Sequence, residues 1–391
     1  MKLLQGRTVD CLFFNGPVQN GDFTFASKPG KAVGIWIAEA LNYLLGAQPV
    51  PHLWNTVRLD GDLRYRRHAA TGSESASRES FEAAAIAAKY GTGPHPAAGT
   101  ITDADPLVAQ LAMEMIECRL SAGILKISSE TVQICARCTH MTSSGGHPCR
   151  ACGHTVSRAH ATRHLVVECD RAAALLDVVH LYALHRRAPL HLRSIAGNTP
   201  ARLILSRIRD HGIALDPLGL PGLVLDPRAG IHITVLAAAQ ACQGKVAVMA
   251  TTANAAANIA AYGQHFIDHG GLRLLYALHG HVPYERVADL RDSDEAYHLA
   301  AETRTAFETW FLPLFALREK NGIRADQLPA LLKYFRRAIL ARPARSDETL
   351  AGLGRSIREG DTDWIGRKTA LAAALGTGIR ATQQSPWGHP S

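Results

Sequence analysis

The sequence predicts an α/β protein that carries a metal-binding hairpin and ends in a helical region. Three observations support this fold class: a buried strand with a glycine-containing turn and a helix near the N-terminus, two Cys-x-x-Cys pairs in the middle, and a mainly helical pattern after residue 259. The chain has 391 residues, of which 47% are hydrophobic and 19% charged, so it can bury a sizeable core in two to three domains.

The first fifty residues read as strand, turn and helix. Residues 9–14 combine β-branched and aromatic side chains, as buried strands do. Asn15, Gly16 and Pro17 break this run, and residues 31–45 then place apolar side chains along one helical face. This order brings backbone N–H groups to a helix N-terminus, where they favour anions.

The middle of the chain predicts further elements. Asp105 before Pro106 marks the start of a helix that runs to about residue 122. The other expected elements are helices at 79–90, 172–184 and 200–208, a strand at 164–168, and strand-like runs between turns at 218–235.

The two cysteine pairs predict a zinc site. They comprise Cys135 and Cys138, then Cys149 and Cys152, with ten residues between the pairs. Two such turns facing each other across a hairpin supply four soft ligands for a tetrahedral ion. His140, His147 and His154 lie close enough to replace a cysteine, which leaves the ligand set open. A closed four-ligand shell has no position for substrate, so we expect a structural zinc.

Cysteine usage and the N-terminus indicate a reducing compartment. The other four cysteines, Cys11, Cys118, Cys169 and Cys242, are scattered singly, as in reduced cytoplasmic proteins. No signal peptide and no run of ~18 apolar residues is found, so we expect a cytoplasmic protein outside the membrane. The net charge of +8 permits an acidic partner such as RNA or a nucleotide without requiring one.

Three further stretches follow one another in an informative order. They are Asn15-Gly16-Pro17-Val18-Gln19-Asn20-Gly21-Asp22, then Leu205-Ser206-Arg207 ahead of Gly212-Ile213, and finally residues 269–276. Together with the cysteine pairs they resemble the methionyl-type class I aminoacyl-tRNA synthetases over roughly residues 10–280. That family has Asn-Gly-Pro-x-His-x-Gly-His, a zinc-bearing insertion, Ile-Ser-Arg before Gly-Ile-x-x-Pro, and a helix Tyr-Gly-x-Asp-x-x-Arg-Tyr in these places.

The resemblance implies a Rossmann-like, HUP-type parallel sheet split by a zinc-ribbon insertion. It divides the chain into a first half-domain at 1–116, the insertion at 117–200, a second half-domain at 201–285 and a helical region with a disordered tail at 286–391. The substrate pocket is expected at the carboxyl ends of the strands. The implied substrate-binding candidates are Phe13, Asn15, Gly16, Gly21, Val235 and Ala238, although Phe13 equally fits a plain core position.

The chain departs from the family where ATP is handled. The two histidines that contact ATP phosphates in the family are Gln19 and Asp22 here, and a carboxylate ~4 Å from a phosphate costs about 4 kcal/mol at an effective dielectric of 20. The Lys-Met-Ser-Lys-Ser signature falls on residues 251–255, which hold no lysine, and Lys245 is the nearest cation. Trp-x-Asp-Ala falls on residues 234–238 and has lost both Trp and Asp.

These departures leave three functions to weigh. The favoured one is an aminoacyl-handling or amino-acid-activating ligase used in small-molecule biosynthesis, with an amino acid and a nucleotide such as ATP as ligands. The alternatives are a catalytically silent binding or assembly subunit and an ordinary methionine-tRNA ligase. A tRNA partner is not expected, whereas a protein partner or a homo-oligomer remains open. The catalytic candidates are Gln19, Asp22, Arg207 and Lys245, and Arg207 also fits an ordinary surface position.

Overall fold

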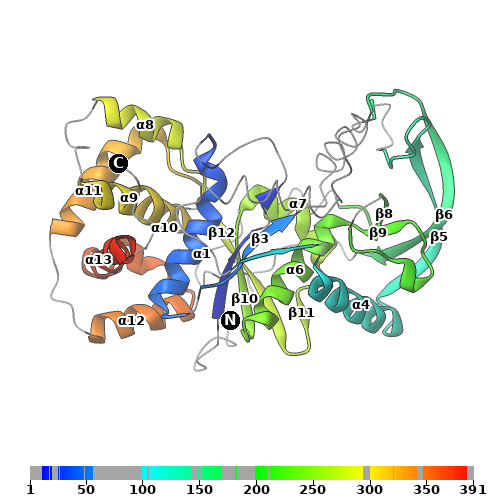
Figure 1. Cartoon of the computed structure of the whole chain (residues 1–391), viewed down its shortest axis with the longest axis horizontal. Coiled ribbons are helices and arrows are strands. Elements are labelled where there is room, and N and C mark those ends of the chain that lie inside the picture. Colours follow the sequence, from blue (N-terminus) through cyan, green and yellow to red (C-terminus); the bar gives the residue numbers. More distant parts are fainter. Residues whose placement is uncertain are drawn as a thin grey trace.

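The computed structural model describes residues 11–16, 18–19, 25, 27–47, 49–55, 99–103, 105–142, 148–149, 152–169, 181–182, 199–209, 212–293, 300–319, 321–340 and 347–384. The described part is elongated, with a central sheet, a helical region at one end and a long hairpin at the other (Figure 1). The helix expected at 79–90, most of the one at 172–184, the sites Gly21 and Asp22, and the tail beyond residue 384 lie outside the described residues.

The core of the molecule is a parallel sheet. Its strands are β1 (Cys11–Asn15), β10 (Val246–Thr252) and β12 (Leu272–His279) in that order, with the short β11 (Asp268–His269) antiparallel at the edge. A second parallel set comprises β2 (Val18–Gln19), β3 (His52–Asn55) and β4 (Thr100–Thr102). The strand expected at residues 9–14 is therefore confirmed as β1 over its described part.

The side chain of Asn15 joins the two sets of strands. The amide of Asn15 donates to the carbonyl oxygen of Leu53 and accepts from its N–H, both at 2.9 Å. This arrangement imitates the pairing of two strands, and it places β3 beside the end of β1. Two residues earlier in β1, the side-chain amide of Asn42, from the following helix, accepts from the Phe13 N–H at 2.9 Å and donates to the Phe13 carbonyl at 2.8 Å. The strands thus lie in the spatial order β4, β3, β1, β10, β12.

Helices cover both faces of this sheet. On one face lies α1 (Val33–Leu44), which follows a 3-10 turn at Pro29–Ala32, and on the other lie α6 (Pro227–Ala241) and α7 (Ala253–Gly263). Strand residues alternate between the faces: Phe13 and Val248 belong to the α1 cluster, whereas Phe14 and Met249 belong to the α6 cluster. A parallel sheet with both faces covered confirms the α/β class.

An antiparallel segment extends from the sheet beyond α4 (Pro106–Ser121) (Figure 1). It contains β5 (Leu125–Cys135), β6 (Ser157–Glu168) and β7 (Arg202–Ile204), followed by the hairpin of β8 (Ser206–Ile208) and β9 (Leu223–Leu225), with a 3-10 turn at Asp216–Leu218. The helix expected to start at Pro106 is confirmed.

Three expectations for the second half are wrong. Residues 200–208 form β7 and β8 instead of a helix. Of the strand-like runs at 218–235, only β9 is a strand, because α6 begins at Pro227. Residues 269–276, which the resemblance compares with a helix, form a turn and most of β12.

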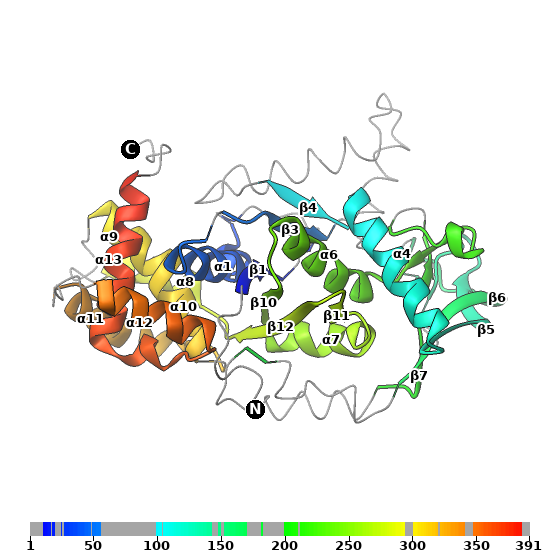
Figure 2. The same cartoon turned by 90° about the horizontal axis from the view of Figure 1, so that it is seen from below.

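The C-terminal part is helical, as expected. It comprises α8 (Tyr284–Ser293), α9 (Ala301–Thr305), a π-helical turn (Ala306–Phe311), α10 (Leu312–Arg318), a 3-10 turn (Ala325–Gln327), α11 (Leu328–Leu340), α12 (Asp347–Arg358), a 3-10 turn (Asp363–Gly366) and α13 (Lys368–Gln384) (Figure 2). This region shares a core with α1. Among the described residues, no helix combines the length and apolar character needed to cross a membrane.

Two glycines connect the sheet to the helical region. The N–H of Gly280, just after β12, donates to the Ala316 carbonyl oxygen at 2.8 Å. The N–H of Ile323 donates to the His281 carbonyl oxygen, also at 2.8 Å. A Cβ on Gly280 would lie 2.3 Å from the backbone nitrogen of Gly322. The backbones therefore touch, and only glycine fits at position 280.

Candidate functional site

The four cysteines of the two pairs converge at the tip of the β5–β6 hairpin. Their sulfur atoms all lie within 4.8 Å of one another. The Sγ atoms of Cys135 and Cys152 are 3.5 Å apart, and those of Cys138 and Cys149 are 3.6 Å apart. A disulfide needs about 2.05 Å, whereas a tetrahedral zinc with ~2.3 Å bonds separates its sulfurs by about 3.8 Å. The spacing fits a metal ion and excludes a disulfide.

The two turns that carry these cysteines have the same hydrogen bonds. In the first, Cys135 N–H donates to the His140 carbonyl at 2.8 Å and Thr139 N–H donates to the Cys135 carbonyl at 3.0 Å. In the second, Cys149 N–H donates to the His154 carbonyl at 2.8 Å and Gly153 N–H donates to the Cys149 carbonyl at 2.7 Å. Thr139 and Gly153 occupy the same place with φ of 59° and 73°. Two equivalent turns therefore present two thiols each.

Hydrogen bonds within the first turn act on the Cys135 thiol. Burial raises the pKa of the Cys135 thiol, but hydrogen bonds from the backbone N–H groups of Cys138 and Arg137 outweigh burial and bring the pKa to about 6. Among the described residues, the metal-competent group consists of cysteines alone, and His147 lies outside them. Four thiols of this geometry suit zinc and fill its coordination shell.

A second candidate site lies at the carboxyl edge of the parallel sheet. From β1 the chain moves outward to β3 and β4, and it later returns to the other side of β1 as β10 and β12. The strand order therefore reverses between β1 and β10, which is where open α/β sheets bind ligands. Asn15 and Gly16 follow β1 at this edge, and Thr252 ends β10 and caps α7 by accepting from Ala255 N–H at 3.2 Å.

Two glycines allow close approach at this edge. Gly16 N–H donates to the Ala250 carbonyl at 2.7 Å, and a Cβ on Gly16 would lie 3.0 Å from that oxygen. A Cβ on Gly34, in the first turn of α1, would lie 2.9 Å from the same oxygen. The first turn of α1 thus lies directly against the end of β10.

His279, at the end of β12, completes this edge. The register pairs it with Thr252, and its side chain is 6% exposed with Nδ1 3.0 Å from the Gly280 carbonyl oxygen. Nδ1 therefore carries the proton, and Nε2 is an acceptor that lies 3.6 Å from the position of a Cβ on Gly34. Burial lowers the pKa of His279 to about 4, so this residue is neutral near pH 7.

The substrate-binding candidates from the sequence are spread over the core and this edge. Asn15 and Gly16 lie at the edge. Phe13 is fully buried and packs edge-on against Tyr182 with ring centroids 5.1 Å apart. Val235 and Ala238 are fully buried in the middle of α6. These last three residues occupy core positions, and their role in substrate binding stays a prediction.

The described catalytic candidates lie on or beside different strands. Gln19 lies in β2, close in sequence to the reversal point. Lys245 immediately precedes β10, at the amino edge of the sheet. Thr252 lies seven residues further along the chain, or about 23 Å away in a strand, which exceeds the reach of a lysine side chain. Lys245 and the carboxyl edge therefore do not share one site.

Arg207 belongs to a separate ionic cluster with two residues that the sequence analysis missed. Asp226 is completely buried and accepts from Arg207 Nε at 2.6 Å. It also accepts from Arg228 Nε at 2.9 Å, Nη2 at 2.8 Å and the backbone N–H at 2.9 Å. Burial raises the pKa of the Asp226 carboxyl, but the bonds from Arg228 and the charges of both arginines bring it to about 2. The Asp226-Pro227 dipeptide could have drawn attention to Asp226, because this pair is typical of a helix N-terminus.

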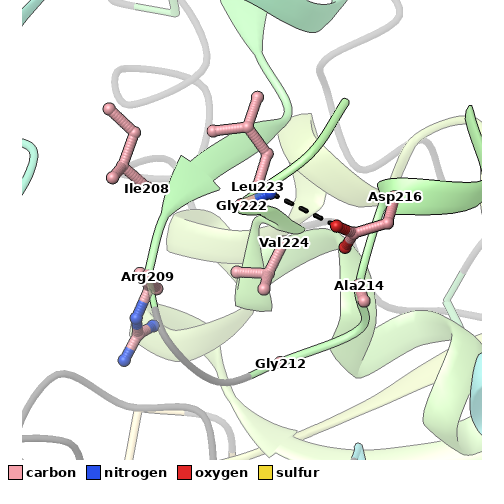
Figure 3. A pocket seen from close by; sticks show the side chains of 8 residues that line it. All are labelled: Ile208, Arg209, Gly212, Ala214, Asp216, Gly222, Leu223 and Val224. Carbon is pink, nitrogen blue, oxygen red and sulfur yellow. Dashed lines mark hydrogen bonds between the residues drawn. The ribbon is translucent and has the colours of Figure 1, made fainter. Parts of the chain in front are cut away.

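A hollow of about 310 Å³ lies beside the β8–β9 hairpin (Figure 3). It is lined by Ile208, Arg209, Gly212, Ala214, Asp216, Gly222, Leu223 and Val224. The carboxylate of Asp216 points toward Gly222 and accepts from its N–H at 3.4 Å, and Arg209 already has an interaction partner. Neither charged group of the hollow is free, so we assign no ligand to it.

Comparison with known proteins gives a fold likeness and no close relative. No protein-family model matches the chain, and no curated protein matches it in sequence. The structure is similar to methionyl-tRNA synthetase from Mycobacterium tuberculosis in complex with methionyl-adenylate, with a TM-score of 0.53 and 13% identity over 96% of this chain and 94% of that one. A second structure of that synthetase, also bound by methionyl-adenylate, gives 0.50 and 12% over 96% and 84%. At this identity the likeness concerns the fold.

Proposed function

We propose that this chain is a synthetase-like ligase that activates or holds an amino acid for small-molecule biosynthesis. The observation that carries the proposal is the reversal point between β1 and β10, within a fold that resembles structures bound by an aminoacyl-adenylate. On this proposal, the amino acid and a nucleotide such as ATP bind at the carboxyl edge, beside Asn15, Gly16 and Thr252. His279 would accept a hydrogen bond from the ligand, because its Nε2 is the unprotonated nitrogen.

The structure changes which departures from the family support this proposal. Residues 251–255 were matched to the lysine signature by counting back from a helix expected at 269–276. Because that segment is β12, the lack of lysine at 251–255 no longer tests the signature. The replacement of two histidines by Gln19 and Asp22 therefore carries the argument against ordinary ATP chemistry.

The aspartate of the family's Trp-x-Asp-Ala pattern also has a candidate equivalent in this chain. The segment Val224-Leu225-Asp226-Pro227 holds an aspartate directly after a strand and at the start of α6. It fits the Trp-x-Asp-Ala pattern at its aspartate better than residues 234–238, which lie inside the helix. On this reading the family's Trp is Val224, so an aromatic wall of the amino-acid pocket is absent while the acid is kept.

The zinc would have a structural role on this proposal. The four cysteines would hold it at the hairpin tip, where it supplies folding energy and no open coordination position. We retain the division into half-domains at 1–116 and 201–285, an insertion at 117–200 and a helical region at 286–391. We also retain the expectation that tRNA is not a partner.

The direct test is ATP–pyrophosphate exchange with each of the twenty amino acids. We expect no exchange with methionine and exchange with a different amino acid. Robust exchange with methionine would restore the ordinary methionine-tRNA ligase. No exchange at all, and no heat of binding for ATP or amino acids at millimolar concentration, would favour the silent subunit.

A pair of variants places the activity at the carboxyl edge. His279→Phe removes the Nε2 acceptor and should lower exchange or amino-acid binding by about tenfold, the loss of one hydrogen bond to a charged group. His281→Phe is the matched control, because that side chain is exposed two residues away. Equal effects of both changes would contradict the assignment.

A further inference from the structure

A second hollow, of about 320 Å³, lies at the amino edge of the parallel sheet. Three segments that are far apart in the sequence line it: α4, the end of α6 with the turn that follows, and the turn between β11 and β12. We call it the amino-edge hollow. Its apolar lining comes from Leu111 and Leu272, and its polar side chains are Glu114, Gln240, Gln243 and His269. Its volume is at the lower end of the range of ligand pockets, so it suits a small molecule.

Arg119 fixes the tautomer of His269. Nη1 of Arg119 lies 3.2 Å from Nδ1 of His269, and a guanidinium can only donate. Nδ1 is therefore the acceptor, and the neutral ring carries its proton on Nε2. The Arg119 side chain is itself held, because it is 10% exposed and its Nε donates to the His265 carbonyl oxygen at 2.9 Å. Nε2 of His269 makes no hydrogen bond to any described residue, so its N–H can donate to a molecule in the hollow.

Gln243 places a side chain where the backbone favours glycine. It follows α6 with φ of 57°, and its N–H donates to the Gln240 carbonyl at 3.0 Å, while that of Gly244 donates to the Ala239 carbonyl at 2.8 Å. This pair of bonds is a common helix end, in which glycine usually takes the left-handed position. The side chains of Gln243 and Gln240 make no hydrogen bond within the part of the chain that the structure describes. Two amide groups at the hollow therefore lack a protein partner.

Glu114 gives the amino-edge hollow a negative charge. Its Oε1 accepts from Gln110 Nε2 at 2.9 Å, and it forms no ion pair with any described lysine or arginine. The C-terminus of α6, the negative end of the helix dipole, lies at the same hollow. The described lining contains no lysine or arginine. The hollow therefore favours a cation over an anion.

We propose that the amino-edge hollow binds a small primary amine in its ammonium form, with a hydrogen-bond acceptor such as an amide carbonyl close to the nitrogen. The ammonium donates to Glu114 and to the side-chain oxygens of the two glutamines, and the acceptor receives the Nε2–H of His269. An apolar substituent lies against Leu111 and Leu272. A carboxylate beside the ammonium would face no cation, so the hollow prefers an amino amide to a free amino acid. This site is at the opposite edge of the sheet from the proposed amino-acid site, and it does not rest on the proposed function.

The test is calorimetric titration of the full-length protein at constant ionic strength with three probes of similar shape. L-leucinamide has both the ammonium and the carbonyl, L-leucine replaces the amide by a carboxylate, and 4-methylpentanamide lacks the ammonium. We expect L-leucinamide to bind most tightly and 4-methylpentanamide at least tenfold more weakly. Glu114→Gln should weaken L-leucinamide about tenfold, because a hydrogen bond between charged groups is lost. Glu114 is exposed on α4, so the fold should survive this change.

Glu117→Gln is the matched control, because Glu117 is exposed on the same helix but does not line the hollow. Gln243→Gly removes the amide and suits the left-handed backbone, so it should weaken L-leucinamide several-fold without lowering the melting temperature. Wild-type affinity in Glu114→Gln, an equal loss in Glu117→Gln, or no binding of L-leucinamide would overturn the proposal. Loss of binding in His279→Phe but not in Glu114→Gln would also overturn it, because the probe would then occupy the carboxyl edge.

Discussion

Replacing Asp226 by asparagine should destabilise the protein in a pH-dependent way. The change keeps the size of the side chain but removes the charge that the two arginines face. The carboxyl has a pKa of about 2 in the folded protein, against an ordinary value of 3.8. A difference of nearly two units corresponds to about 2–3 kcal/mol of stability at neutral pH, at ~1.36 kcal/mol per unit.

The sign of the pH effect follows from the direction of this shift. The folded protein binds the proton more weakly than the unfolded chain does, so the ionised carboxylate stabilises the fold. Its contribution is complete above about pH 4 and is lost as the pH falls toward 2. With these two pKa values, about half of the contribution remains at pH 3.

Urea unfolding of the wild type and of Asp226→Asn from pH 7 to pH 3 measures this contribution. The difference in unfolding free energy should be constant from pH 7 to about 5 and shrink below pH 4. Zinc release on acidification affects both proteins and cancels in the difference. Asp289→Asn is the control and should cost less than about 1 kcal/mol, because its ion pair is exposed. Equal stability at pH 7, or a difference that does not shrink at pH 3, would refute the reasoning.

Two further changes test the metal site and the junction with the helical region. Cys149→Ser should reduce zinc from one ion per chain to a small fraction, measured by atomic absorption, and lower the melting temperature; full zinc content in this variant would show that the four sulfurs are not the ligands. Gly280→Ala should cost about 1–3 kcal/mol or more in urea unfolding, because its Cβ would lie 2.3 Å from the Gly322 nitrogen. In Gly376→Ala, where a Cβ meets nothing within 4 Å, stability should instead rise by about 0.5–1 kcal/mol. Similar losses in both alanine variants would indicate that contact at position 280 is not the cause.

Local patterns were sufficient for part of the fold. The apolar spacing of α1, the Asp105-Pro106 start of α4 and the run that forms β1 are each complete within one segment. The cysteine pairs were also predictable, because each turn holds its two thiols through hydrogen bonds within five residues. Signals of this kind do not depend on the rest of the chain.

Tertiary packing decided the segments that were misread. Helix α6 contains the β-branched residues Ile231, Ile233, Thr234 and Val235, whose side chains favour strands, but all are buried beneath the sheet and packing overrides the preference. The Asp226-Pro227 pair at the start of α6 is typical of a helix N-terminus. The glycine and proline turns before it instead favoured a prediction of strand-like runs. The short runs of β7 and β8 do not distinguish helix from strand by themselves.

The direction of β10 shows why the candidate site was harder to predict than the fold. Lys245 and Thr252 are seven residues apart, a separation of about 10 Å in a helix but about 23 Å in a strand. Closeness in sequence therefore made Lys245 a candidate for a site at the opposite edge of the sheet. His279 is 27 residues beyond Thr252, yet the parallel register pairs the two directly. Lys245 lies at the amino edge and His279 is neutral, so on the proposed function neither would supply the positive charge that a bound polyphosphate needs. On that proposal the charge would come from another element or from a divalent cation that accompanies the nucleotide.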